Sequence, residues 1–346
     1  MSRRALSLLL ASVLALGLTL TAAVATVPYV ALGPGPTYNT LGEVDGSPVL
    51  EIDGREVFPT DGHLDLTTVG VQPSLTLAQA LQGWFARDLA VVPREVVFPT
   101  GRTDDEVDAE NAAAMEASQS DAVGAAAREL GLLPEIVVAE LNDDSPAQGL
   151  LEVGDVLTAV DGTAVADADA LRARISDRTP GDPVSIAYVR DGRPATAEVV
   201  TGTATADGAT RPVIGVLPEE RYPLDVTINL ADVGGPSAGL MFALGILDKV
   251  GEESLTGGKY VAGTGEISPD GTVGPIGGIT QKLIAAGRKG AVAFLVPAAN
   301  CAEAVRNPPD GLVLARVGSL DEALTALEAV RDGDAPVTCA AARTTG

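Results

Sequence analysis

At residues 233–239 the sequence reads Val-Gly-Gly-Pro-Ser-Ala-Gly, between a strand-like run at 224–230 and an apolar, helix-like run at 240–250. A serine at a glycine-lined turn that opens a helix has an exposed hydroxyl, free backbone N–H groups beside it and the helix dipole behind it. Such a turn can hold a nucleophile, here Ser237. Gly-Pro-Ser is also ordinary helix-start chemistry, so the turn alone leaves a structural N-cap as the simpler interpretation.

On either side of this turn, residues 210–331 alternate strand and helix patterns. Strands are expected at 213–217, 224–230, 259–267, 272–276, 291–296 and 312–317, and helices at 236–250, 279–288, 298–306 and 319–330. This alternation predicts an α/β or α+β domain.

A serine nucleophile needs a base, and histidine is the usual one. The only histidine, His63, lies far away in sequence at a probable strand start, where a structural polar residue is expected. Lysine can replace histidine when burial among apolar groups lowers its pKa. Lys282 fits, because it follows Pro-Ile-Gly-Gly-Ile-Thr-Gln at a helix start and precedes Leu283 and Ile284. A solvated helix lysine is the alternative interpretation.

Three strings in this region are VGGPSAGLMFAL, GTGEISPDGTVGPIGGITQKLIAAGRKG and VGSLDEAL. In this order and spacing they resemble the proteolytic domain of Lon, a family of Ser-Lys endopeptidases, over residues 214–327. The resemblance implies that Ser237 is the nucleophile, that Lys282 is the general base and that the hydroxyl of Thr264 orients the lysine. It also implies that backbone N–H groups at the turn from Gly235 and Pro236 to Ser237 hold the oxyanion.

The chain departs from the Lon pattern at two points. Lon proteases usually carry an aspartate where Gly234 stands. The sequence also contains no Gly-x-x-x-x-Gly-Lys-[Ser/Thr] string, the phosphate-binding motif of an ATPase module.

A second resemblance lies upstream, over residues 131–203. The string SPAQGLLEVGDVLTAVDG, a strand at 136–141, a capped helix at 167–175 and closing strands at 183–190 and 194–200 resemble a PDZ domain of the bacterial kind. The resemblance implies capture of an extended peptide, which adds a strand beside the first strand of the domain. The peptide-binding residues expected there are Leu132, Leu133, Ile136, Val137 and Val138.

Residues 28–130 read as short strands and turns followed by helices at 76–87 and 104–130, and they carry no recognisable chemistry. Before them, residues 5–27 form an uncharged apolar run that follows Arg3 and Arg4 and has about the length of a membrane span. We therefore expect a single-pass anchor in the cell membrane with the bulk of the chain extracytoplasmic. A signal peptide that is removed after the small residues at 23–25 is the alternative.

The chain has 23 basic and 47 acidic residues, a formal net charge of −24, which argues against nucleic acid as a partner. Its two cysteines, Cys301 and Cys339, are expected to pair in an oxidising compartment, with two free thiols as the alternative. Two cysteines and one histidine are too few for a typical zinc site, so neither a metal nor another cofactor is expected.

These predictions describe an α+β protein with segments 1–27 (anchor or signal), 28–130, 131–203 (PDZ), 210–331 (Lon-type proteolytic domain) and a loop-like tail, 332–346. The order resembles the membrane-anchored PDZ-Lon proteins of Gram-positive bacteria. That resemblance implies an ATP-independent, membrane-tethered serine endopeptidase that cleaves unfolded or regulatory proteins captured by the PDZ domain. It also implies a homo-oligomer, because Lon-type domains usually work as rings.

Two other hypotheses remain at this stage. The chain could be a non-catalytic PDZ scaffold that binds peptides and carries an inactive Lon-like domain, and Gly234 is the feature that favours this alternative. A chymotrypsin-like PDZ protease is disfavoured, because His63 is the only histidine and lies in no matching motif.

Overall fold

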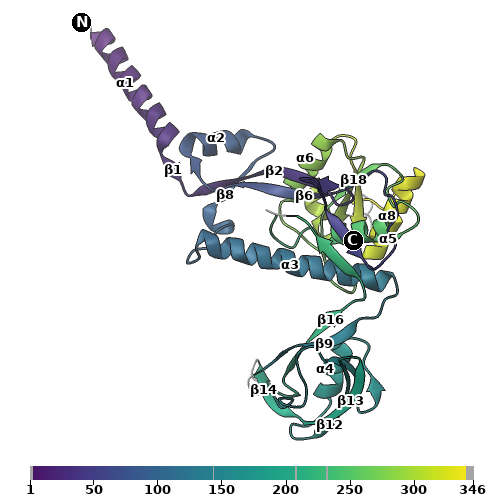
Figure 1. Ribbon diagram of the computed structural model, residues 1–346. Helices are drawn as coiled ribbons and strands as arrows, with labels where there is room; N and C mark the ends of the chain where they lie inside the picture. Colours follow the sequence, from purple (N-terminus) through teal and green to yellow (C-terminus); the bar gives the residue numbers. More distant parts are fainter. Residues whose placement is uncertain (1–2, 143, 207–208, 231–232, 340–346) are drawn as a thin grey trace. The chain divides into compact units, whose positions relative to one another are not determined.

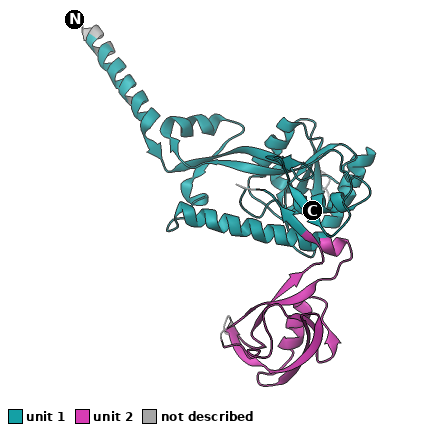
Figure 2. Cartoon of the chain, viewed as in Figure 1, with its two compact units in different colours: residues 1–126, 226–346 teal, residues 127–225 magenta. Residues whose placement is uncertain are grey.

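The computed structural model describes residues 3–142, 144–206, 209–230 and 233–339. The chain forms two compact units (Figure 2). Unit 1 comprises residues 1–126 and 226–346, and unit 2 comprises residues 127–225. Unit 2 is therefore inserted into the sequence of unit 1, a division that differs from the successive segments expected from the sequence.

Unit 1 is built on a six-stranded mixed sheet (Figure 1). In sheet order its strands are β22 (Val313–Val317), β21 (Ala293–Pro297), β18 (Tyr260–Gly263), β6 (His63–Gln72), β2 (Tyr29–Asn39) and β8 (Ala90–Pro93). The first four are parallel, and β2 runs antiparallel to β6 and to β8. Residues 28–130, which carry no chemistry of their own in the sequence, thus provide half of the strands of this sheet.

Most of the described helices of unit 1 pack against strands of this sheet. They are α1 (Arg3–Val24), α2 (Leu77–Phe85), α3 (Asp104–Glu129, whose last residues belong to unit 2), α5 (Gly239–Val250), α6 (Ile279–Lys289), α7 (Cys301–Ala304) and α8 (Leu320–Asp332), with 3-10 turns η1 (Arg94–Val96) and η2 (Ala298–Asn300). The first ten residues of α5 are all buried, because that segment is apolar on almost every side and packs as a central helix.

Short antiparallel pairs complete unit 1. They are β1 (Thr26–Val27) with β7 (Leu75–Thr76), β3 (Glu43–Val44) with β4 (Ser47–Pro48), β5 (Leu50–Asp53) with β17 (Asp225–Ile228), and β19 (Glu266–Ile267) with β20 (Val273–Gly274).

Within the part of the chain that the structure describes, no helix has both the length and the apolar character of a membrane span. The transmembrane helix expected at residues 5–27 is therefore not supported. The helix found there, α1, ends at Val24, and Thr26 and Val27 at the end of the expected span form strand β1, which pairs with β7.

Unit 2 is a small antiparallel sheet with one helix, α4 (Ala168–Ser176). In order its strands are β13 (Arg193–Val200), β12 (Pro183–Arg190), β10 (Val156–Val160), β9 (Glu135–Leu141) and β16 (Val216–Arg221), with β11 (Thr163–Ala164) beside β10 and a separate hairpin of β14 (Gly202–Ala206) and β15 (Ala209–Val213). Asp167 caps α4, because its carboxylate accepts a hydrogen bond of 2.6 Å from the N–H of Ala170.

The pairing of strand β16 within unit 2 was not expected from the sequence. Residues 213–217 were expected in the domain that follows the PDZ segment, but β16 pairs antiparallel with β9 over its whole length. The core of unit 2 accordingly includes Ile214, with Val216 packed against it. The unit thus extends beyond residue 203, to Asp225.

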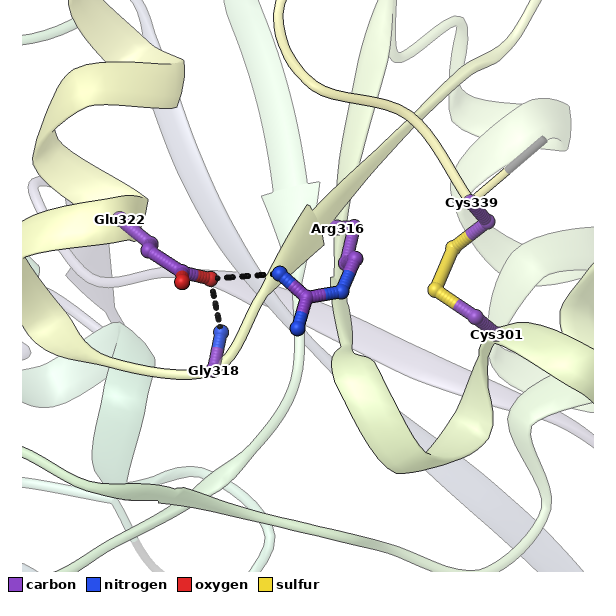
Figure 3. Close-up of a disulfide and its surroundings, with 5 residues drawn as sticks. All are labelled: Cys301, Arg316, Gly318, Glu322 and Cys339. Carbon is purple, nitrogen blue, oxygen red and sulfur yellow. Dashed lines mark hydrogen bonds and ion pairs between the residues drawn. A yellow bond between two sulfur atoms is a disulfide. The ribbon is translucent and has the colours of Figure 1, made fainter. Parts of the chain in front are cut away.

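Cys301 and Cys339 are joined by a disulfide, as predicted (Figure 3). It fixes the C-terminal segment beside β22, where Cys339 N–H donates to the C=O of Leu314 and Arg316 N–H to that of Val337. Near it, the Glu322 carboxylate at the start of α8 accepts bonds from the Arg316 guanidinium and from Gly318 N–H (Figure 3). The tail expected to be loop-like is therefore held as far as Cys339, and residues 340–346 lie outside the described residues.

Candidate active site

The turn at Ser237 lies just before α5, and Ser237 itself is half-buried. Its backbone carbonyl is held twice, by Gly265 N–H at 3.0 Å and by the hydroxyl of Thr264 at 2.9 Å. In return, Leu240 N–H in the first turn of α5 donates to the C=O of Gly265. These reciprocal bonds fix the serine against the segment that follows β18.

Lys282 lies in the first turn of α6, which begins after Gly278 in the left-handed conformation. The neighbouring Ile279 and Leu283 are in the core, and this position buries the lysine side chain until only 2% of the residue is exposed. The Nζ of Lys282 is 2.6 Å from the Oγ of Ser237 and 2.8 Å from the Oγ1 of Thr264.

Burial lowers the pKa of Lys282 from 10.5 to about 7, against a smaller opposing effect of the Glu266 carboxylate. Desolvation destabilises the ammonium form, and the two hydroxyls offer no compensating negative charge. The amine is therefore neutral in a large share of molecules near neutral pH, where its lone pair can accept the proton of the Ser237 hydroxyl.

Thr264 is fully buried between these two groups. Its hydroxyl donates to the C=O of Ser237 and accepts from Nζ of Lys282. One hydroxyl thus fixes both the backbone of the serine and the direction of the lysine. The structure brings together all three residues that the sequence named as catalytic.

The expected oxyanion donors need correction. Pro236 has no N–H, and the N–H of Gly235 donates to the C=O of Asn111 in α3 at 2.8 Å. Among the bonds between described residues, none engages the N–H of Ser237 or of Ala238. These two N–H groups, at the start of α5, are the donors that the turn can present to a developing oxyanion.

Helix α3 explains the glycine at position 234. A Cβ built on Gly234 would lie 2.9 Å from the Cβ of Asn111, so any larger residue, including the aspartate usual in Lon proteases, would push the turn away from α3. Two helical turns further on, the hydroxyl of Ser118 donates to the C=O of Pro236 at 2.9 Å. Neither contact was foreseen, because no motif marks Asn111 or Ser118 in this alanine-rich helix.

A cleft of about 460 Å³ opens onto Ser237 and Lys282. One wall comes from the N-terminal strands, with Pro36 and Tyr38 of β2 and residues 66–70 of β6. The other includes the serine turn, Glu266 and Ile276. A chain segment placed in this cleft would lie against the nucleophile.

The peptide-binding residues expected in unit 2 are not at a free edge. Ile136, Val137 and Val138 are buried in β9, which has β10 on one side and β16 on the other. Leu132 N–H donates to the C=O of Ala127, and Leu133 is 75% exposed. No strand can therefore add beside β9 as the sequence analysis expected.

His63 has a structural environment. Its ring stacks on that of Tyr260, and its Nδ1 is 3.5 Å from Oδ1 of the buried Asp65. Asp65 in turn accepts bonds from Tyr260 and from Thr37. In the described ranges, no cluster of three or more His, Cys, Asp or Glu side chains could hold a metal ion.

Comparison with known proteins bears on both units. Residues 230–327 match the sequence model of the Lon protease (S16) C-terminal proteolytic domain, and residues 109–201 match that of the PDZ domain. Together with the relatives described next, these matches make residues 230–327 a Lon-type serine peptidase domain.

Similar curated proteins are Lon proteases. Lon protease 2 of Bacillus subtilis (strain 168) is 36% identical over 103 residues, which are 29% of this chain and 18% of that protein. Lon protease of Haemophilus influenzae is 33% identical over 137 residues, which are 37% of this chain and 16% of that protein. The chain thus covers less than a fifth of the length of these relatives.

Two solved structures that are similar to part of this chain are PDZ domains of SdrC-like proteins. The one from Listeria monocytogenes is 27% identical, with 24% of this chain and 86% of that chain covered and a TM-score of 0.23. The one from Listeria innocua is 28% identical, with 25% and 93% covered and a TM-score of 0.23.

Proposed function

We propose that this chain is a serine endopeptidase that cleaves unfolded or regulatory proteins with a Ser237–Lys282 dyad. The observation that carries the proposal is the 2.6 Å contact between Nζ of Lys282 and Oγ of Ser237, made by a lysine whose burial lowers its pKa to about 7. A buried, neutral amine beside an accessible serine is the arrangement that nucleophilic catalysis needs.

In the proposed reaction, the neutral amine of Lys282 takes the proton of the Ser237 hydroxyl while Oγ attacks the carbonyl carbon of the scissile peptide bond. The N–H groups of Ser237 and Ala238 stabilise the oxyanion of the tetrahedral intermediate. The ammonium of Lys282 then gives its proton to the leaving amine, and an ester to Ser237 remains. A water molecule, deprotonated by the same lysine, hydrolyses this ester.

Three further parts of the proposal concern the need for ATP, the location of the chain and its assembly. Cleavage is proposed to be ATP-independent, since the sequence contains no phosphate-binding Gly-Lys motif. The Cys301–Cys339 disulfide favours an extracytoplasmic location. Attachment to the cell membrane and assembly into a homo-oligomer rest on the sequence resemblance alone. Fractionation of cells, with the mature N-terminus sequenced, tests the attachment: a soluble chain that starts near Thr26 would exclude it.

The test is cleavage of an unfolded protein such as reduced, alkylated casein by the purified chain, with and without ATP. We expect cleavage without ATP that Ser237→Ala and Lys282→Ala each reduce by at least about a thousandfold, as removal of a dyad member does in other serine peptidases. Lys289→Ala, which removes an exposed lysine at the end of α6, is the control and should leave the rate unchanged.

A second candidate function is a peptide-binding scaffold. Gly234 favoured it at first, but the contact with Asn111 accounts for that glycine in terms of packing. If the unmutated chain cleaves nothing at concentrations that allow assembly, while it still binds peptides, the scaffold becomes the better proposal.

A further inference from the structure

Helix α2 turns its large apolar side chains away from the sheet. Its buried residues are the small Ala80 and Gly83, and a Cβ on Gly83 would lie 2.6 Å from Cγ2 of Val91 in β8, so a larger residue would push the helix away. The large apolar residues are exposed and form what we call the α2 face: Leu77, Leu81, Trp84 and Phe85. At this spacing they lie on one side of the helix. A surface helix of a soluble protein normally points such a side toward the core.

The α2 face adjoins helix α1. The two helices are in contact (Figure 1), and Leu77 N–H at the start of α2 donates to the C=O of Ala25, just after α1, at 2.9 Å. Residues 9–17 of α1 are exposed without a break, which is about two and a half helical turns. Among the described residues, nothing covers any side of this part of α1.

Both helices belong to uncharged stretches of sequence. Residues 5–42 and 66–86 contain no Asp, Glu, Lys or Arg, although 20% of the whole chain is charged. The pairing of β1 with β7 brings these two stretches together. The exposed surface of α1 and the α2 face therefore form one apolar, uncharged region.

A lipid bilayer is the partner that fits this region. A protein partner would cover one side of α1 and leave the others in water, whereas lipid can surround a helix on every side. Trp84 suits the level of the headgroups, because an indole has an apolar body and one N–H donor. Its ring packs edge-on against that of Tyr29, with 5.8 Å between the ring centroids. A net charge of −24 disfavours anionic lipid, so the lipid that fits is neutral overall.

We propose that the α2 face is a membrane-docking surface, on which Leu81, Trp84 and Phe85 enter the headgroup region of a bilayer of neutral lipid. In this arrangement α2 lies in the plane of the interface and does not cross the bilayer. The inference rests on the proposed attachment of the chain to a membrane, and it adds a contact made by α2 that the N-terminal helix does not itself provide.

The test uses the fluorescence of Trp84, which is the only tryptophan of the chain and therefore reports on the α2 face. The full chain is added to vesicles of phosphatidylcholine, and flotation of the vesicles measures whether the chain binds them. We expect bound chain in which the emission of Trp84 moves to shorter wavelength. Lipid that carries bromine on the acyl chain close to the headgroup should quench this emission about twofold, as for a tryptophan at the membrane interface.

Two matched substitutions locate the contact. Leu81 is 44% exposed on the α2 face, and Val313 is 39% exposed on β22, at the sheet edge opposite to β8, against which α2 packs. Leu81→Glu should remove most of the quenching, because a carboxylate on this face opposes its entry into lipid, while Val313→Glu should preserve it. Thermal unfolding checks that both variants fold.

Three results would overturn the proposal. Vesicle-bound chain with unquenched Trp84 would leave attachment through α1 intact but remove α2 from the membrane. Absence of binding to the vesicles would remove the proposed attachment as well. Emission that moves to shorter wavelength with rising protein concentration, in the absence of lipid, would assign the α2 face to a second copy of the chain. The casein assay tests the peptidase separately from all three.

Discussion

Lys282 depends on its surroundings for its charge state. Among the described residues, its amine is bonded by two hydroxyls alone, those of Ser237 and Thr264, and both are neutral. Burying an ammonium beside neutral hydroxyls alone is unfavourable in free energy, whereas a neutral amine carries no such penalty. The pKa of Lys282 therefore decides above which pH the amine of the proposed dyad is neutral and can act as a base.

The pH profile is the prediction at this scale. Because the pKa of Lys282 is lowered to about 7, the base form is scarce at pH 5 and dominant above pH 8. The kcat/KM for a short unstructured peptide should rise about tenfold per pH unit below pH 7 and level off above about pH 8. Rates measured from pH 5 to 9 check this expectation.

Lys282→Arg is the matched variant for this profile. An arginine stays protonated throughout this range and cannot act as the base, so activity should be absent at every pH. A rate that is flat between pH 5 and 7, or an active Lys282→Arg chain, would contradict the role of Lys282 as the base.

The sequence predicted those residues of the proposed site that lie in a recognisable local motif. Ser237 and Lys282 each stand in a glycine-rich motif at a helix start. Thr264 was named through the resemblance to Lon proteases. The expected oxyanion donors were wrong in part: Ser237 N–H stays available, but Gly235 N–H donates to Asn111, more than a hundred residues earlier. No local pattern contains that contact.

At the scale of elements, α3 supports the serine turn through two hydrogen bonds. It accepts the Gly235 N–H through the C=O of Asn111 and binds the C=O of Pro236 through the hydroxyl of Ser118. The turn is thus held at the two residues before the nucleophile as well as at the nucleophile itself. In these terms Ser118 is a positioning residue.

Ser118→Ala is the corresponding prediction. Loss of one hydrogen bond of about 1 kcal/mol to the turn should lower kcat about fivefold and leave KM unchanged, because Ser118 touches the turn and not the cleft. Steady-state kinetics at pH 8 measure this split.

Ser120→Ala is its control, since Ser120 is exposed on the same helix. It should change neither constant, and the midpoint of thermal unfolding should serve for both variants as a check on folding. Equal effects of the two substitutions, or a change in KM alone, would remove the positioning role of Ser118.

Strand β16 shows why elements can be predicted while their partners cannot. A strand was expected at 213–217, and one is found at Val216–Arg221. Its pairing with Glu135–Leu141, however, joins segments about 80 residues apart in sequence. The pattern of apolar residues in a strand does not indicate which other strand it pairs with. Because this pairing was not predicted, the peptide was expected beside β9, at the edge that β16 covers.

At the scale of the whole molecule, unit 1 is a single structure made from two distant stretches of sequence. Strand β6 lies between β2 and β18, with the register Tyr260 to His63 and Gly263 to Leu66 on one side. Part of the cleft wall at Ser237 also comes from β2 and β6. The segment that matches the Lon-type domain, residues 230–327, is thus incomplete without residues 28–126.

Two altered chains test this organisation. Replacement of residues 127–225 by a Gly/Ser linker of about 20 residues should leave unit 1 folded and able to cleave a short peptide. A fragment of residues 226–346 should lack a cooperative thermal transition, because β18 would have an open edge in place of β6. Circular dichroism and peptide cleavage measure both, and a cooperatively folded fragment would refute the shared sheet.

The insertion of unit 2 into unit 1 also sets an order of events during synthesis. A ribosome makes β2 and β6 early, but their neighbour β18 appears about 190 residues after β6. Unit 2 has all its strands in one continuous stretch, so it can fold while unit 1 still waits for its remaining strands. A nascent chain of this protein therefore completes its PDZ-type unit before Lys282 joins Ser237 in the proposed dyad.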